Sequence, residues 1–139
     1  MAKETIEVTH EFGSPVDKVF GHLSEHENLG PIFGVRVERA KDGNTDRNGV
    51  GSIRRLSLNG LMPFEETVTD FKPNELIEYT ITKGTPLKDH LGTMRFSSTP
   101  DGGTKLHYVI AIEGPPVVTP LVAMQLRRSI AGGLRKTAL

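Results

Sequence analysis

Cysteine and tryptophan are both absent from this chain of 139 residues, and neither sign of charge is in excess. The lack of cysteine excludes disulfides, thiolate metal sites and thiol nucleophiles. Seventeen Lys and Arg balance seventeen Asp and Glu, which argues against the basic surface of a nucleic-acid-binding protein. No apolar run approaches the roughly 20 residues of a membrane span. The first residues lack the apolar stretch of a signal peptide, so we expect a cytoplasmic protein.

Short segments of alternating apolar and polar residues fill most of the chain. Turn signals rich in Gly, Pro, Asn and Asp separate them, for example at residues 59–60 and 101–103. Between the turns, rows such as Ile77, Tyr79 and Ile81 alternate with polar residues, as in strands with one buried face. We count seven strands, spaced closely enough for one antiparallel sheet. The length fits a single domain over residues 1–139.

Two helical segments interrupt this pattern. Ser14 and Pro15 predict a helix start, with Ser14 as the N-cap and Pro15 at the first helical position. Residues 28–31 end that helix or break it into two short pieces. A longer helix follows residues 114–116 and runs toward the C-terminus. Its apolar stripe consists of Val122, Leu126, Ile130 and Leu134.

This order of elements resembles the START-like, helix-grip superfamily, which includes the polyketide cyclase/dehydrase and SRPBCC families and the birch-pollen-allergen-like proteins. The resemblance covers nearly the whole chain. One departure is that members often carry Trp just after the first helical pair, where Phe33 is the nearest aromatic residue here. We therefore expect a cavity of different shape. The segments that carry the resemblance are residues 14–20, 27–31, 49–56, 63–68 and 101–106.

The resemblance implies an α+β fold in which a curved, seven-stranded antiparallel sheet wraps around a long C-terminal helix, with two short helices after the first strand. It also implies an apolar cavity between sheet and helix that holds a bulky apolar molecule, such as a lipid, a polyketide or an aromatic compound. The fold by itself does not decide whether a reaction takes place there. The expected apolar lining includes Phe20, Phe33, Met94, Phe96, Leu106 and Met124.

Several polar residues stand in the rows that should face this interior. A buried polar group is costly unless it is paired or used, and a small-molecule site combines a mostly apolar pocket with a few converging polar groups. The candidate ligand-binding residues are therefore His10, Arg54, Glu66, Tyr79, His90 and Tyr108.

Arg54 and Glu66 fall on strands that would be hairpin neighbours through residues 59–60, so we expect them to pair. The pair is either structural or orients a ligand carbonyl or hydroxyl. The two tyrosines are interpreted as packing aromatics whose hydroxyls find a partner or reach a ligand. His10 and His90 are either structural or an acid or base near neutral pH.

Three interpretations of function follow. The first is a binding module for an apolar small molecule, with no assigned reaction. The alternative is a polyketide cyclase/dehydrase-like enzyme that transfers protons through polar cavity residues, without a metal or nucleotide cofactor; its catalytic residues stay open, as does the oligomeric state. A third is a module that binds a protein partner through its surface, which no large exposed apolar run favours.

Other motifs are interpreted as structural. Residues 22–26 match the His-x-x-Glu-His signature of inverted zinc proteases, but they straddle a helix end in a much smaller chain, so we expect surface residues and no metal. Residues 49–54 lack the third Gly of a dinucleotide-binding motif and lead into a strand, so no cofactor is expected.

The basic residues of the last helix suit a solvated face. Gly132 and Gly133 in that helix indicate close packing of the helix on the sheet or a mobile gate over the cavity.

Overall fold

The computed structural model describes residues 1–58, 61–84 and 87–139. Its strands form one antiparallel sheet in the order β1-β7-β6-β5-β4-β3-β2. The first and last strands are neighbours, with Ala2 opposite Gly114 and Phe12 opposite Thr104. The turn predicted at residues 59–60 lies outside the described residues. The strands are β1 (Ala2–Phe12), β2 (Arg36–Lys41), β3 (Ile53–Leu58), β4 (Leu61–Lys72), β5 (Leu76–Lys83), β6 (Lys88–Ser98) and β7 (Thr104–Gly114).

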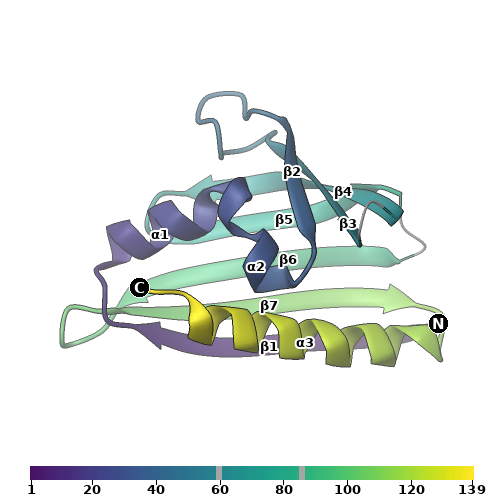
Figure 1. Ribbon diagram of the computed structural model, residues 1–139. Helices are drawn as coiled ribbons and strands as arrows, with labels where there is room; N and C mark the ends of the chain where they lie inside the picture. The colour runs from purple at the N-terminus through teal and green to yellow at the C-terminus, as the bar shows by residue number, and fades with distance from the viewer. Residues whose placement is uncertain (59–60, 85–86) are drawn as a thin grey trace.

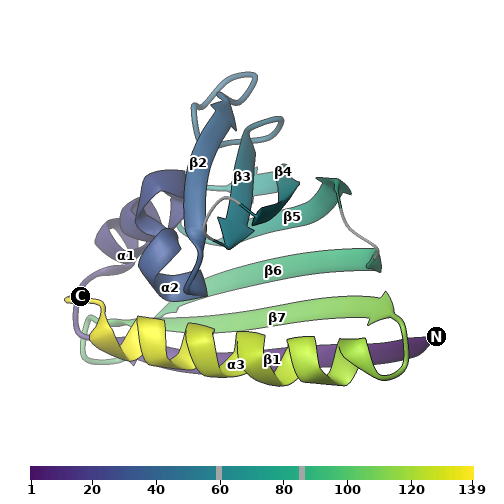
Figure 2. The same cartoon turned by 45° about the vertical axis from the view of Figure 1, so that its right-hand side comes forward.

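The helices lie together on one face of the curved sheet. Figures 1 and 2 show the long α3 running beside β1 and β7, with α1 and α2 next to its C-terminal end. This arrangement confirms the predicted helix-grip fold. Among the residues that the structure describes, no helix combines the length and hydropathy needed to cross a bilayer. The helices are α1 (Val16–Ser24), the 3₁₀ turn η1 (His26–Asn28), α2 (Gly30–Phe33) and α3 (Val118–Lys136).

Strand β7 shows why the alternation predicted the sheet. Its even-numbered residues, from Thr104 to Ile112, are buried, and the residues between them are exposed or half-buried. Successive side chains of a strand point to opposite faces, so one face of β7 packs into the core and the other stays solvated. The same reasoning places Tyr79 and Met94 of the neighbouring strands inside.

The start of α1 differs from the prediction. Pro15 is the N-cap residue and makes no side-chain capping bond. Ser14 instead donates both its backbone N–H and its hydroxyl to the carbonyl oxygen of Leu139, at 3.1 and 2.9 Å. A tertiary contact therefore takes the hydroxyl that local sequence assigned to the cap, and it ties the end of the chain to the start of α1.

The glycine pair of α3 marks a close approach to α2. A Cβ on Gly133 would lie 2.5 Å from the Cα of Ile32, whereas one on Gly132 would meet only the end of the Arg135 side chain, at 3.8 Å. Close packing thus explains Gly133, but the packing partner is α2 and not the sheet expected from the sequence.

Candidate functional site

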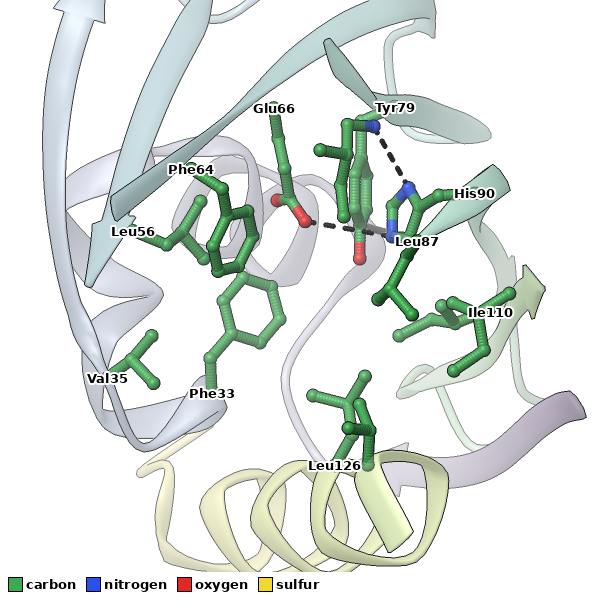
Figure 3. A pocket seen from close by; sticks show the side chains of 13 residues that line it. Phe33, Val35, Leu56, Phe64, Glu66, Tyr79, Leu87, His90, Ile110 and Leu126 are labelled. Carbon is green, nitrogen blue, oxygen red and sulfur yellow. Dashed lines mark hydrogen bonds and ion pairs between the residues drawn. The ribbon is translucent and has the colours of Figure 1, made fainter. Parts of the chain in front are cut away.

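An apolar pocket lies between the inner face of the sheet and α3. Its volume open to water-sized molecules is about 160 Å³. Figure 3 shows Leu126 entering from α3, and Glu66 and His90 turned toward one another at the opposite end. The lining consists of Phe33, Val35, Leu56, Phe64, Glu66, Tyr79, Ile81, Leu87, His90, Ile110, Ile112, Val122 and Leu126.

Glu66 forms a buried ion pair with Arg54, as the hairpin register predicted. The two residues are directly opposite on β4 and β3. Arg54 Nε donates to Glu66 Oε1 at 2.8 Å, and the two side chains are 3 % and 6 % exposed. Burial alone would lower the pKa of Arg54, but the Glu66 carboxylate raises it. The guanidinium therefore keeps its charge, and it holds one carboxylate oxygen of Glu66 in place.

His26 forms a hydrogen bond with the guanidinium of Arg54. Arg54 Nη1 lies 3.3 Å from His26 Nδ1, and His26 Nε2 lies 3.0 Å from the hydroxyl of Ser52. A guanidinium only donates, so Nδ1 accepts and Nε2 carries the proton toward Ser52. Burial, followed by the charge of Arg54, lowers the pKa of His26 to about 3. The ring is neutral near pH 7 and is part of the core, which corrects the expectation of a surface residue.

The Arg54 guanidinium also lies against two rings of the pocket lining. Its Cζ is 4.4 Å from the ring centre of Tyr79 and 5.6 Å from that of Phe33. Such cation–π contacts stabilise a desolvated cation. Nη2 is one of two buried side-chain polar atoms in the described part of the chain without a hydrogen-bond partner. Arg54 itself does not line the pocket, so it acts on the pocket through Glu66 and these rings.

His90 faces Glu66 across a short gap. Its Nε2 is 3.8 Å from Glu66 Oε2, beyond direct hydrogen-bond distance. Its Nδ1 accepts the backbone N–H of Ile81 at 3.1 Å. Burial lowers the pKa of His90 despite the opposing effect of the Glu66 carboxylate. The ring is therefore neutral near pH 7, with its proton on Nε2 and directed at the pocket.

Two strand irregularities set these side chains in place. The β4–β5 register shifts between Glu65 and Glu66, and the β6–β7 register shifts between Lys88 and Leu91. The β5–β6 pairing ends at Tyr79 and Gly92 within the described residues. The Ile81 N–H, which a longer β5–β6 ladder would have paired with β6, thus donates to the His90 ring instead. β-Bulges commonly re-aim side chains next to binding sites.

Tyr79 closes the same end of the pocket and bonds to Tyr108. The two hydroxyls form a hydrogen bond to one another, and burial raises the pKa of both phenols. The Tyr79 ring crosses Gly92 of β6, where a Cβ would lie 2.2 Å from the ring carbon Cζ. Position 92 must therefore be glycine for the Tyr79 ring to lie here, because any side chain would collide with that ring. The hydroxyl pair confirms that these residues pack and find a partner.

Of the residues predicted to form the site, the structure brings Phe33, Glu66, Tyr79 and His90 into the pocket lining. The others predicted as polar contacts lie elsewhere. Arg54 and Tyr108 are buried behind the lining. His10 is half-buried on the edge strand β1, beside the Phe12 ring and near Arg135, away from the pocket.

The predicted apolar lining is corrected in the same way. Phe20 and Phe96 contact each other edge to face with ring centres 5.0 Å apart, near the α1 end of the sheet. Met94 and Leu106 are fully buried in the core rather than exposed to the pocket. Met124 is 45 % exposed on the outward face of α3. Alternation identifies the inward face of an element, but it does not tell how far along that face a cavity extends.

The sequence reasoning missed His26 and most apolar lining residues. His26 belonged to a motif that drew attention for zinc chemistry, and nothing local indicated that Ser52 and Arg54 would surround it. Val122 and Leu126 were recognised as the inward stripe of α3 and do line the pocket. Among the described residues, no group of three or more His, Asp or Glu side chains is arranged to hold a metal ion.

A family model described as "Polyketide cyclase / dehydrase and lipid transport" matches residues 3–138. The chain belongs to this family. The resemblance drawn from the order of strands and helices is thereby confirmed. No curated protein shows a significant match to the chain.

Solved structures share the fold at low sequence identity. A START superfamily protein from Mycobacterium smegmatis superposes with a TM-score of 0.74 at 14% identity, covering 94% of this chain and 93% of that one. A protein from Thermus thermophilus gives 0.75 at 15% identity, with 95% and 92% covered. An aromatase/cyclase from a Streptomyces species gives 0.67 at 16% identity, with 97% and 96% covered. These likenesses establish the helix-grip fold.

Proposed function

We propose that this member of the family binds a small, largely apolar molecule in the pocket between the sheet and α3. The observation that carries the proposal is the composition of the lining: only Glu66, Tyr79 and His90 among the thirteen residues are polar, and they gather at one end. An apolar body and a few convergent polar groups are the usual features of a small-molecule site.

The volume of the pocket limits the size of the ligand that can fit. Typical sites for drug-sized molecules measure about 300–1,000 Å³, whereas this pocket measures about 160 Å³. An engineered apolar cavity of about 150 Å³ holds benzene in another protein. The pocket as it stands therefore suits a molecule of about one ring, and a bulkier ligand would require α3 to move away from the sheet.

Titration with toluene, followed by two-dimensional NMR of the labelled protein, tests the proposal. We expect toluene to shift the resonances of Val35, Ile110 and other lining residues in the wild type. Leu126→Trp should abolish these shifts, because a larger side chain enters the pocket from α3. The matched control is Met124→Trp on the outward face of the same helix, which should leave them unchanged.

Two results would contradict this proposal. One is the absence of any shift at lining residues at toluene concentrations near its solubility. The other is a wild-type response in Leu126→Trp, provided that its spectrum shows a folded protein, because toluene would then bind outside the pocket.

A second candidate function is proton transfer within the pocket. The observation that favours it is the neutral His90 facing the Glu66 carboxylate at 3.8 Å in apolar surroundings. Such a pair can contribute about 10²–10⁴-fold to a rate when a substrate atom lies within hydrogen-bond distance. Glu66→Gln distinguishes the two functions: wild-type turnover that the variant loses would favour the enzyme, whereas a change in ligand affinity with no turnover in either protein would favour the binding function.

A further inference from the structure

We propose that the ligand is a neutral alcohol or phenol whose hydroxyl oxygen bridges Glu66 Oε2 and His90 Nε2. This inference rests on the proposed binding function and adds to it the chemical group that the polar end recognises. It follows from the spacing, the proton positions and the charges of the two side chains.

The spacing leaves a place for one oxygen atom. Glu66 Oε2 and His90 Nε2 are 3.8 Å apart, too far for a direct hydrogen bond. If a ligand oxygen lay about 2.8 Å from each of these two atoms, the angle between the two hydrogen-bond directions at that oxygen would be about 85°. One hydroxyl oxygen can span that angle with its O–H bond and a lone pair.

The two sides of the gap have opposite and fixed hydrogen-bonding roles. A carboxylate oxygen only accepts, and Glu66 Oε1 is already occupied by Arg54 Nε at 2.8 Å. His90 Nε2 only donates, because its Nδ1 accepts the N–H of Ile81. A proton shift to Nδ1 would break that bond and leave a backbone N–H facing another N–H. The site therefore requires a group that both donates and accepts.

Other polar groups fit this end less well. A ligand carboxylate would face the Glu66 carboxylate and would find a single donor, His90 Nε2. An ammonium group would satisfy Glu66 but would present a donor to His90. A hydrocarbon would fill the apolar lining and leave both polar groups desolvated without partners, which is costly. A hydroxyl satisfies both sides at once and adds no charge.

The probes that test this inference share one ring and one methyl group: toluene, p-cresol and p-toluate. In the same NMR titration of the wild type, we expect p-cresol to bind at least about tenfold more tightly than toluene, because its hydroxyl replaces the water lost by two buried polar groups. We expect p-toluate to leave the lining resonances unshifted at neutral pH.

Two variants locate the preference. Glu66→Gln, whose carbonyl oxygen can take the Arg54 bond, presents an amide donor to the ligand, so a hydroxyl would meet two donors and no acceptor. His90→Phe keeps the ring volume and removes the Nε2 proton. In each variant we expect the preference for p-cresol over toluene, measured as the ratio of their affinities, to fall below about threefold.

The outcomes separate this inference from the proposed function. Equal binding of toluene and p-cresol to the wild type, or tighter binding of p-toluate, would overturn the hydroxyl inference and leave the pocket as an apolar binding site. A wild-type preference in folded Glu66→Gln would overturn it as well. If neither toluene nor p-cresol shifted the lining residues, both proposals would fail.

Discussion

Acid should destabilise this protein through His26. The side chain is 1 % exposed, and its Nδ1 accepts a hydrogen bond from the Arg54 guanidinium. A proton on that nitrogen would break the bond and place two positive charges in contact inside the core. Burial and the Arg54 charge accordingly lower the pKa of His26 from 6.5 to about 3.

The sign and size of the effect follow from this shift. Because the folded pKa is depressed, the unfolded chain binds the proton more readily than the folded one between pH 6.5 and pH 3. The contribution of His26 to the free energy of unfolding is fully present above pH 6.5, and it is lost as the pH falls from 6.5 toward 3. Each pH unit well inside it is worth about 1.4 kcal/mol, so a change from pH 7.5 to pH 5 removes about 2 kcal/mol of unfolding free energy.

Urea unfolding of the wild type and of His26→Gln at pH 7.5 and pH 5 measures this loss. Glutamine keeps the pattern of bonds, since its carbonyl can accept from Arg54 and its amide can donate to Ser52, but it does not titrate. The acid-induced loss should be about 2 kcal/mol smaller in His26→Gln than in the wild type, because other titrating groups are common to both.

Ser52→Ala is the control for the hydrogen bond alone. It should lower stability by about 1 kcal/mol at both pH values, because the hydroxyl is lost while the titrating His26 ring remains. An acid-induced loss in His26→Gln equal to that of the wild type would refute the reasoning, since the buried ring would then have no part in the pH dependence.

Three further sets of substitutions test the close packing at Gly133 and Gly92 and the buried Arg54–Glu66 ion pair, each by urea unfolding at pH 7.5. Gly133→Ala should destabilise by about 1–3 kcal/mol against the backbone of α2, whereas Gly132→Ala should stabilise by about 0.5–1 kcal/mol; equal effects would contradict the close approach. Gly92→Ala should cost about 1–3 kcal/mol and change the near-ultraviolet circular dichroism of the displaced tyrosine, and an unchanged spectrum would argue against that contact. Arg54→Met should cost about 3–5 kcal/mol, and adding Glu66→Met should recover most of it; no recovery in the double variant would show that the ion pair is not what the single change disrupts.

Much of the fold was predictable because a strand exposes one face and buries the other. The alternation along β7 and β5 identified inward rows without any tertiary information, and those rows are buried in the structure except for Ile81, which is half-buried and lines the pocket. The same logic predicted the Arg54–Glu66 pair, because two charged residues on adjacent strands of a hairpin, both inward, must neutralise each other.

The candidate site was predictable only in part. Glu66, Tyr79 and His90 were identified as inward polar residues and do meet in the pocket. His10 was chosen by the same rule and lies away from it, on an edge strand. The two-residue period of a strand predicts which face of the sheet a side chain lies on. How far that side chain lies from the cavity depends instead on where α3 crosses the sheet.

The amino-acid sequence by itself determined the order of strands and helices, the buried face of each, and the family to which the chain belongs, because these depend on local periodicity and on turn and helix-stop residues. Only the tertiary structure decided the chemistry of the polar end. The register shifts beside Glu66 and His90, and the end of the β5–β6 ladder that leaves Ile81 N–H to the imidazole, arise from non-local strand pairing. Proton positions depend on such contacts, and no local pattern in the chain encodes them.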